Sequence, residues 1–118
     1  MNKELPAPVA RWFSCWNSGE IDDLPITDDF CHTSPFGTIE TKARYMEIVT
    51  KNRESFLGNK LSILEQIVEG NNVCVQFQQT REDDAEFQMT VCEWYVLEGD
   101  RIREIRSFYN IGNAVIQG

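Results

Sequence analysis

A histidine and a serine two residues apart, His32 and Ser34, are the first residues along the chain whose side chains could do chemistry. If Asp28 to Ser34 form a β-strand, both side chains point to the same face. An unperturbed imidazole titrates near neutral pH, so His32 is a candidate general base. A hydrogen-bonded structural role is the alternative, because catalysis also needs a geometry that sequence does not specify.

Glu93 is the second candidate, because it is a carboxylate within an otherwise apolar run, Met89 to Leu97. Buried beside aromatic rings, it would have a raised pKa and could act as a neutral hydrogen-bond donor. Alternatively, Arg106 on a neighbouring strand forms an ion pair with Glu93, which is the interpretation we favour. The two exclude each other, because a nearby guanidinium lowers the pKa of a carboxyl group. Either way, Glu93 is expected to border an interior cavity.

Aromatic side chains could enclose a flat apolar ligand beside these groups, although such residues also serve simply as core. The residues expected to line the ligand site are Trp12, Trp16, Ser34, Tyr45, Phe77, Gln79, Arg106, Phe108 and Asn110.

Charge and composition exclude several classes of function. The 118 residues include 11 Lys and Arg against 19 Asp and Glu, and this net charge of −8 would repel nucleic acid and anionic membranes. No apolar stretch approaches the ~20 residues that span a bilayer, and no apolar signal region starts the chain. We therefore expect a cytoplasmic protein with reduced cysteines. With one histidine and no C-x-x-C pair, neither a metal nor another cofactor is expected.

The spacing of apolar residues changes along the chain from helical to extended. It predicts a helix from Pro6 or Pro8 to Ser18 and another from Thr41, a capping residue, to about Leu57. Four extended runs with short polar turns follow, at 60–69, 73–81, 86–97 and 101–110. Helices before strands predict an α+β fold, with the helices packed on one face of a curved antiparallel sheet.

The last hairpin decides which side chains face the helices. A two-residue turn at Gly99 and Asp100 places Glu93 opposite Arg106 and on the helix-facing side of the sheet. The other face would then carry Trp94, Val96, Ile105 and Tyr109. Because this outer face is apolar, we expect a homodimer through it. One bulge in the hairpin would exchange the two sets.

The order of these elements resembles the nuclear-transport-factor-2-like superfamily over residues 9–110. The resemblance is carried by the helix, the Ser34-Pro35-Phe36-Gly37 turn, the second helix and the Gly99-Asp100-Arg101-Ile102 turn in the meander. Within the superfamily, the chain is similar to SnoaL-like polyketide cyclases and ketosteroid isomerases. The resemblance implies one domain over residues 1–118, a cone-shaped roll in which an antiparallel sheet of four to six strands wraps around N-terminal helices.

The positions that are catalytic in this superfamily carry other residue types here. The base of the isomerases falls on Ser34, and their oxyanion-hole tyrosine falls on Trp12, whose indole N–H still donates one hydrogen bond. Their second oxyanion donor falls on Glu93, and the terminal acid/base residue of the cyclases falls on Asn110. The catalytic positions on an earlier strand of the epoxide hydrolases fall near Phe77 and Gln79.

The expected function is therefore binding of a small, largely apolar molecule. The resemblance implies cofactor-free isomerisation, cyclisation or hydration next to a carbonyl, the work of an isomerase or lyase. His32 would move the proton, while Trp12 and Glu93 would stabilise the oxyanion. The alternative is a non-catalytic ligand-binding or dimeric interaction module that has lost the catalytic carboxylates of the superfamily.

Overall fold

The structure, a computed structural model, describes residues 5–110. Its elements follow in the order α1 (Ala7–Ser18), the 3₁₀ turn η1 (Ile21–Asp23), β1 (Ile26–Ser34), β2 (Gly37–Glu40), α2 (Lys42–Lys51), α3 (Arg53–Phe56), β3 (Asn59–Glu69), β4 (Asn72–Arg81), β5 (Asp84–Glu98) and β6 (Arg101–Phe108).

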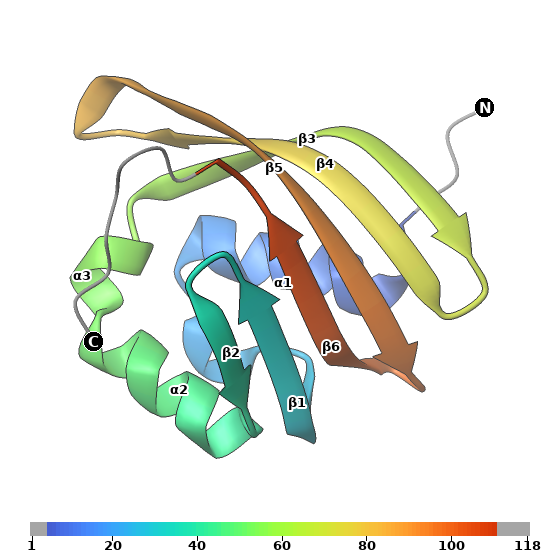
Figure 1. Cartoon of the computed structure of the whole chain (residues 1–118). Coiled ribbons are helices and arrows are strands. Elements are labelled where there is room, and N and C mark those ends of the chain that lie inside the picture. The colour runs from blue at the N-terminus through green and yellow to red at the C-terminus, as the bar shows by residue number, and fades with distance from the viewer. Residues whose placement is uncertain (1–4, 111–118) are drawn as a thin grey trace.

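The six strands form one curved, open sheet in the order β2-β1-β6-β5-β4-β3, and α1 lies along its concave face (Figure 1). Neighbouring strands are antiparallel, except that β1 and β6 run parallel. The predicted α+β class and the curved sheet around N-terminal helices are confirmed, with six strands at the upper end of the expected range.

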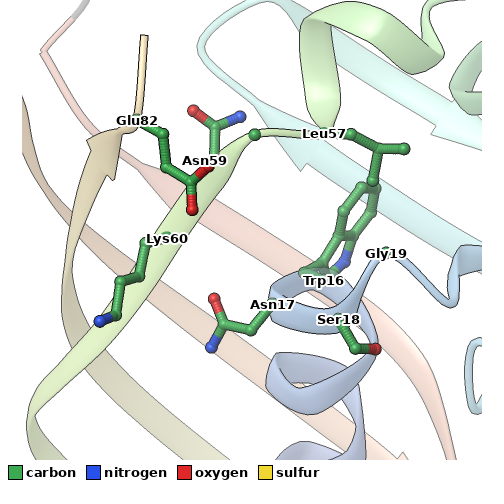
Figure 2. A pocket seen from close by; sticks show the side chains of 9 residues that line it. Trp16, Asn17, Ser18, Gly19, Leu57, Asn59, Lys60 and Glu82 are labelled. Carbon is green, nitrogen blue, oxygen red and sulfur yellow. The ribbon is translucent and has the colours of Figure 1, made fainter. Parts of the chain in front are cut away.

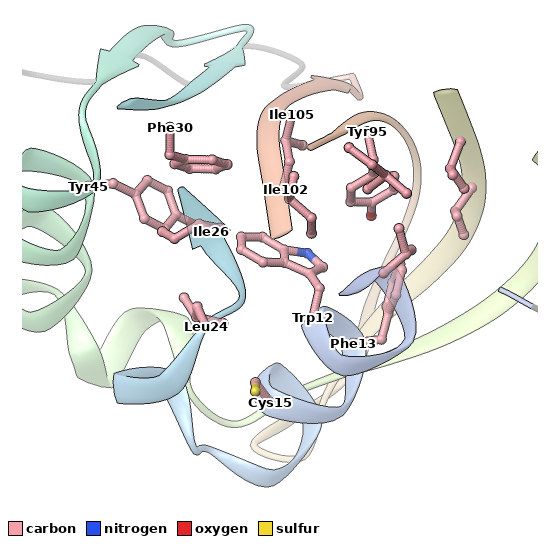
Figure 3. Packing of buried hydrophobic residues seen from close by; sticks show 14 of the residues in the cluster. Trp12, Phe13, Cys15, Leu24, Ile26, Phe30, Tyr45, Tyr95, Ile102 and Ile105 are labelled. Atoms are coloured by element: carbon pink, nitrogen blue, oxygen red, sulfur yellow. The ribbon is translucent and has the colours of Figure 1, made fainter. Parts of the chain in front are cut away.

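The core forms where the apolar stripe of α1 meets the concave face of the sheet. Trp12 lies beside the rings of Phe30 and Tyr45, with ring centroids 6.2 Å away in each case (Figure 3). One residue further along α1, Phe13 packs edge-on against Phe77 at 5.1 Å. Aromatic contacts of this kind contribute about 0.5–1.5 kcal/mol beyond the area they bury, so they hold α1 in the concavity.

Two elements differ from the sequence-based expectation. The second helix does not continue to Leu57, because Asn52 ends α2 with its side-chain amide donating to the Ile48 carbonyl at 2.8 Å, and the short α3 follows. The segment after the Ser-Pro-Phe-Gly turn forms β2, which pairs with β1. Thr41 caps α2 as predicted, because its hydroxyl accepts from the Arg44 N–H at 3.2 Å.

The register predicted for the last hairpin is wrong. The pairing shifts between Val96 and Leu97, so that Glu93 lies opposite Ser107 instead of Arg106. Such an irregularity adds one residue to one strand and exchanges the two faces beyond it. Ile105 is therefore fully buried against the helices, whereas Phe108 is 58% exposed on the outer face.

This register predicts how two adjacent positions respond to truncation. We expect Ile105→Ala to lower the free energy of unfolding by about 2–5 kcal/mol, because it empties a buried site. Arg106→Ala should cost no more than about 1 kcal/mol, since its guanidinium lies on the outer face, against the Trp94 ring and near Glu104. Urea unfolding followed by circular dichroism measures both. A larger loss for Arg106→Ala than for Ile105→Ala would favour the hairpin without the bulge.

Candidate functional site

The carboxyl group of Glu93 is buried in the core and surrounded by hydrogen-bond donors. Glu93 is 8% exposed. The Tyr95 hydroxyl donates to Oε1 at 2.5 Å, and the Ser107 hydroxyl lies 2.6 Å from Oε2. The indole of Trp12 also lies close enough to the carboxyl group to lower its pKa. Tyr95 shares the face of Glu93 two residues along β5, and Ser107 lies directly opposite on β6, so the sheet register alone assembles this cluster.

His32 joins the cluster through the parallel pairing of β1 with β6. It lies next to Ile105 on β6, and its Nε2 is 3.3 Å from the Ser107 hydroxyl oxygen. The imidazole also packs on the Tyr45 ring, with ring centroids 5.4 Å apart. We call His32, Ser107, Glu93 and Tyr95 the buried polar chain. His32 is its only half-buried member, because the other three are buried.

Burial shifts the protonation of both ionisable ends of this chain towards the neutral form. Desolvation lowers the pKa of His32 from 6.5 to about 4. Desolvation also raises the pKa of Glu93, and this effect outweighs the hydrogen bonds from Ser107, Tyr95 and Trp12, which lower it. Burial and the nearby Glu93 carboxyl likewise raise the pKa of Tyr45 and Tyr95. Burial therefore disfavours the charged form of both groups, the carboxylate of Glu93 and the imidazolium of His32.

The ion pair that we favoured between Glu93 and Arg106 is wrong. The bulge turns Arg106 to the opposite face of the sheet, where its guanidinium carbon lies 5.0 Å from the centre of the Trp94 ring. Arg106 also approaches Glu104, at 3.9 Å between Nε and Oε2. The alternative prediction, a buried Glu93 with a raised pKa, agrees with the structure.

The other residues predicted to line a ligand site fall into three groups. Trp12, Tyr45 and Phe77 belong to the buried core. Half-buried positions are taken by Trp16, Ser34 and Gln79. Phe108 is exposed on the outer face because of the bulge, contrary to the prediction, and Asn110 is exposed just after the end of β6.

Two surface cavities lie away from the buried polar chain. The larger, of about 530 Å³, lies between the end of α1 and the start of β3, where Trp16 and Leu57 face Lys60 and Glu82 (Figure 2). The smaller, of about 150 Å³, is lined mainly by charged residues, including Arg11, Asp23 and Asp100. Neither is lined by His32 or Glu93, because the neighbouring aromatic side chains pack against one another.

Residues 5–110 contain neither a metal-binding cluster nor a membrane-spanning helix. This part of the chain holds no group of three or more His, Cys, Asp or Glu side chains that could bind a metal ion. Nor does it contain a helix long and apolar enough to cross a bilayer.

Sequence reasoning did not single out Ser107 or Tyr95. Tyr95 could have been found, because a residue two positions from Glu93 on a strand shares its face. Ser107 depends on the bulge, since the bulge-free register turns it away from Glu93. One signal was available in the sequence. Ser107 lies two positions after Ile105, so if Ile105 faces the core, the small hydroxyl side chain of Ser107 faces it too.

The lowered pKa of His32 predicts a loss of stability in mild acid. The unfolded chain takes up a proton at His32 as the pH falls below 6.5, whereas the folded chain resists until about 4. Over this interval the free energy of unfolding should fall by about 3 kcal/mol from this residue, at about 1.4 kcal/mol for each pH unit. Urea titrations at several pH values should show a shallower decline for His32→Gln. Equal declines in the two proteins would contradict the burial of the imidazole.

Known structures with the same fold include proteins named as enzymes. A candidate polyketide cyclase from Sinorhizobium meliloti is 14% identical with a TM-score of 0.75, covering 87% of this chain and 94% of its own. An epoxide hydrolase from M. tuberculosis is 16% identical with a TM-score of 0.75. The match covers 90% of this chain and 82% of the hydrolase. A nuclear-transport-factor-2-like protein of unknown function from Cytophaga hutchinsonii is 18% identical with a TM-score of 0.73. The match covers 93% of this chain and 95% of that protein. At these identities the likeness concerns the fold.

The family assignment comes from the sequence itself. The comparison with curated proteins found no match. The family model for the SnoaL-like domain matches residues 9–105, which span α1 to the middle of β6 and include His32 and Glu93. The chain therefore belongs to the SnoaL-like domain family.

Proposed function

We propose that this protein binds a small, uncharged and largely apolar carbonyl compound and moves a proton next to its carbonyl group without a cofactor. The observation that carries the proposal is the buried polar chain, in which a half-buried imidazole is hydrogen-bonded through Ser107 to a buried carboxyl group. Paired acid and base groups with pKa values displaced by burial are typical of proton-transfer sites. The solved structures named as cyclase and epoxide hydrolase support this class of chemistry.

His32 is the member of the chain that contacts the ligand in this proposal. Its Nε2 is directed at Ser107, so Nδ1 is the ring nitrogen left to meet a ligand. Glu93 acts on His32 through Ser107 and does not contact the ligand, because Tyr95 and Ser107 already hydrogen-bond both of its carboxyl oxygens. The indole of Trp12 is likewise engaged by Glu93 instead of being free for an oxyanion.

The preference for an uncharged ligand follows from electrostatics. The groups that shift the pKa of Glu93 include no Lys or Arg of the described residues. A ligand anion would thus be buried next to a carboxyl group without a compensating cation, which is costly. The free cysteines Cys15, Cys31, Cys74 and Cys92 suit a reducing compartment, so we place this activity in the cytoplasm.

A non-catalytic, dimeric interaction module is the second candidate function. The observation that favours it is an apolar row on the outer face of the sheet, in which Ile67, Cys74 and Trp94 lie opposite one another on β3, β4 and β5, with the Arg106 guanidinium of β6 over the Trp94 ring. Ile67 is 71% exposed and Trp94 40%. We infer that a second copy of the chain covers this row, because it holds no carboxylate that would repel its copy in a chain of charge −8.

Catalysis can be tested with cyclohex-3-en-1-one, whose double bond moves into conjugation when a proton is transferred next to its carbonyl group. We expect the wild-type protein to produce the conjugated ketone, measured by ultraviolet absorbance, and His32→Ala to lower the rate by about 10²–10⁴-fold. Thr50→Ala, an exposed position on α2, is the matched control and should react like the wild type. If the wild type and His32→Ala react at the same rate, the proposed catalysis is wrong. The non-catalytic interaction module is then the remaining candidate function.

The dimer can be tested by sedimentation at micromolar concentration. We expect a mass of two chains for the wild type and of one chain for Ile67→Asp, because a second copy covering this row would have to desolvate the new carboxylate. Thr50→Asp adds the same charge away from the sheet and should remain dimeric. A wild type that sediments as a monomer would rule out the shared outer face.

A further inference from the structure

The hydroxyl group of Ser107 lies between two groups that both need its hydrogen bond. Its oxygen is 2.6 Å from Glu93 Oε2 and 3.3 Å from His32 Nε2. A serine hydroxyl has one proton, so it can donate to one of these neighbours and must accept from the other. The second hydrogen bond therefore needs a proton that belongs to His32 or to Glu93.

Two arrangements with an uncharged imidazole satisfy all three groups. In the first, His32 carries its proton on Nε2 and donates to Ser107, which donates to an ionised Glu93. In the second, a protonated Glu93 donates to Ser107, which donates to Nε2, and the proton of the neutral imidazole is on Nδ1. The imidazole is uncharged in both, and the second arrangement has one more proton than the first.

We propose that Ser107 is a positioning residue that joins His32 and Glu93 into one proton acceptor, in which a proton taken up at Nδ1 of His32 ends as a proton on Glu93. The inference rests on the proposed function and deepens it, because it identifies which group finally holds the proton removed from the ligand.

The proton transfer conserves atoms and charge. The C–H bond next to the carbonyl breaks as an N–H bond forms at Nδ1, and the ligand becomes an enolate. The Nε2–H proton moves to the Ser107 oxygen, while the original Ser107 proton moves to Glu93 Oε2. The net charge of −1 passes from Glu93 to the enolate, and no oxidant or further reactant is needed. The reverse steps return a proton to another carbon of the ligand.

The surroundings explain why the two residues need each other. His32 alone is a weak base, because burial lowers its pKa to about 4. The carboxyl group is the stronger acceptor, because burial raises its pKa and no Lys or Arg within residues 5–110 acts on it. The titratable groups around it are Tyr45 on α2, Tyr95 on β5 and Tyr109 after β6, all phenols whose pKa burial raises. Glu93 is thus the better proton acceptor of the two, but it is buried. His32 is half-buried, so a ligand can contact His32 and cannot contact Glu93.

The tautomer of the imidazole reports this coupling directly. The chain has a single histidine, so its ring ¹⁵N resonances are unambiguous. As the pH falls in the ¹⁵N-labelled wild type, we expect the N–H to move from Nε2 to Nδ1 when Glu93 takes up its proton, with the ring still neutral. Charging of the ring should follow only near pH 4.

Variants separate the relay from simple burial. Ser107→Ala and Glu93→Gln should each abolish the tautomer change, whereas Ser107→Thr, which keeps the hydroxyl group, should retain it. Ser62→Ala, an exposed serine on β3, is the matched control and should behave like the wild type. A wild-type ring that keeps one tautomer until it becomes charged would overturn the proposal. A tautomer change that persists in Ser107→Ala would overturn it as well.

The relay and the proposed function fail in different ways. If cyclohex-3-en-1-one is converted in a His32-dependent manner while the tautomer never changes, His32 acts alone and the relay is wrong. If the tautomer changes and no conversion occurs, the relay stands and the proposed catalysis is wrong.

Discussion

The burial of one carboxyl group constrains much of this structure. Moving Glu93 from water into the core without partners would cost several kcal/mol, so its position requires donors at hydrogen-bond distance. Two donors come from neighbouring strands, Tyr95 from β5 and Ser107 from β6, and the Trp12 indole on α1 lies close enough to lower the pKa of the same carboxyl group. Helix packing, strand register and the polar interior are thus parts of one arrangement, in which a shift of any element leaves a buried polar group unpaired.

The same arrangement places two of the three buried polar or charged residues of the described chain, Glu93 and Ser107, side by side. Around the buried polar chain, the rings of Trp12, Phe30 and Tyr45 pack with centroid separations of 5.0–6.2 Å. These rings keep water from Glu93 and leave half-buried His32 as the member nearest to solvent. A ligand that reached His32 would meet an imidazole with an apolar wall, which suits a molecule with a single polar group.

Sequence reasoning reached the fold class because the underlying signals are local. Helical spacing on Val9, Trp12 and Phe13, and alternation in the later runs, require no knowledge of distant contacts. The burial of Glu93 was also predictable, since it is flanked by apolar residues. The register of β6 was not, because one bulge between Val96 and Leu97 depends on how the hairpin twists and packs. That single residue determined whether Arg106 or Ser107 met Glu93, and with it the chemistry of the site.

The parallel contact between β1 and β6 has a consequence for how the chain acquires its fold. β6 is the last described strand along the chain, yet it lies between β1 and β5 near the middle of the sheet. The β1–β2 hairpin therefore has no sheet to join until β6 exists, even though it is synthesised some 60 residues earlier. On the ribosome, β3, β4 and β5 can form their meander first, while β1 exposes its apolar face. Assembly of His32 with Ser107 is thus among the last events of folding, and the site is completed only when the sheet itself is.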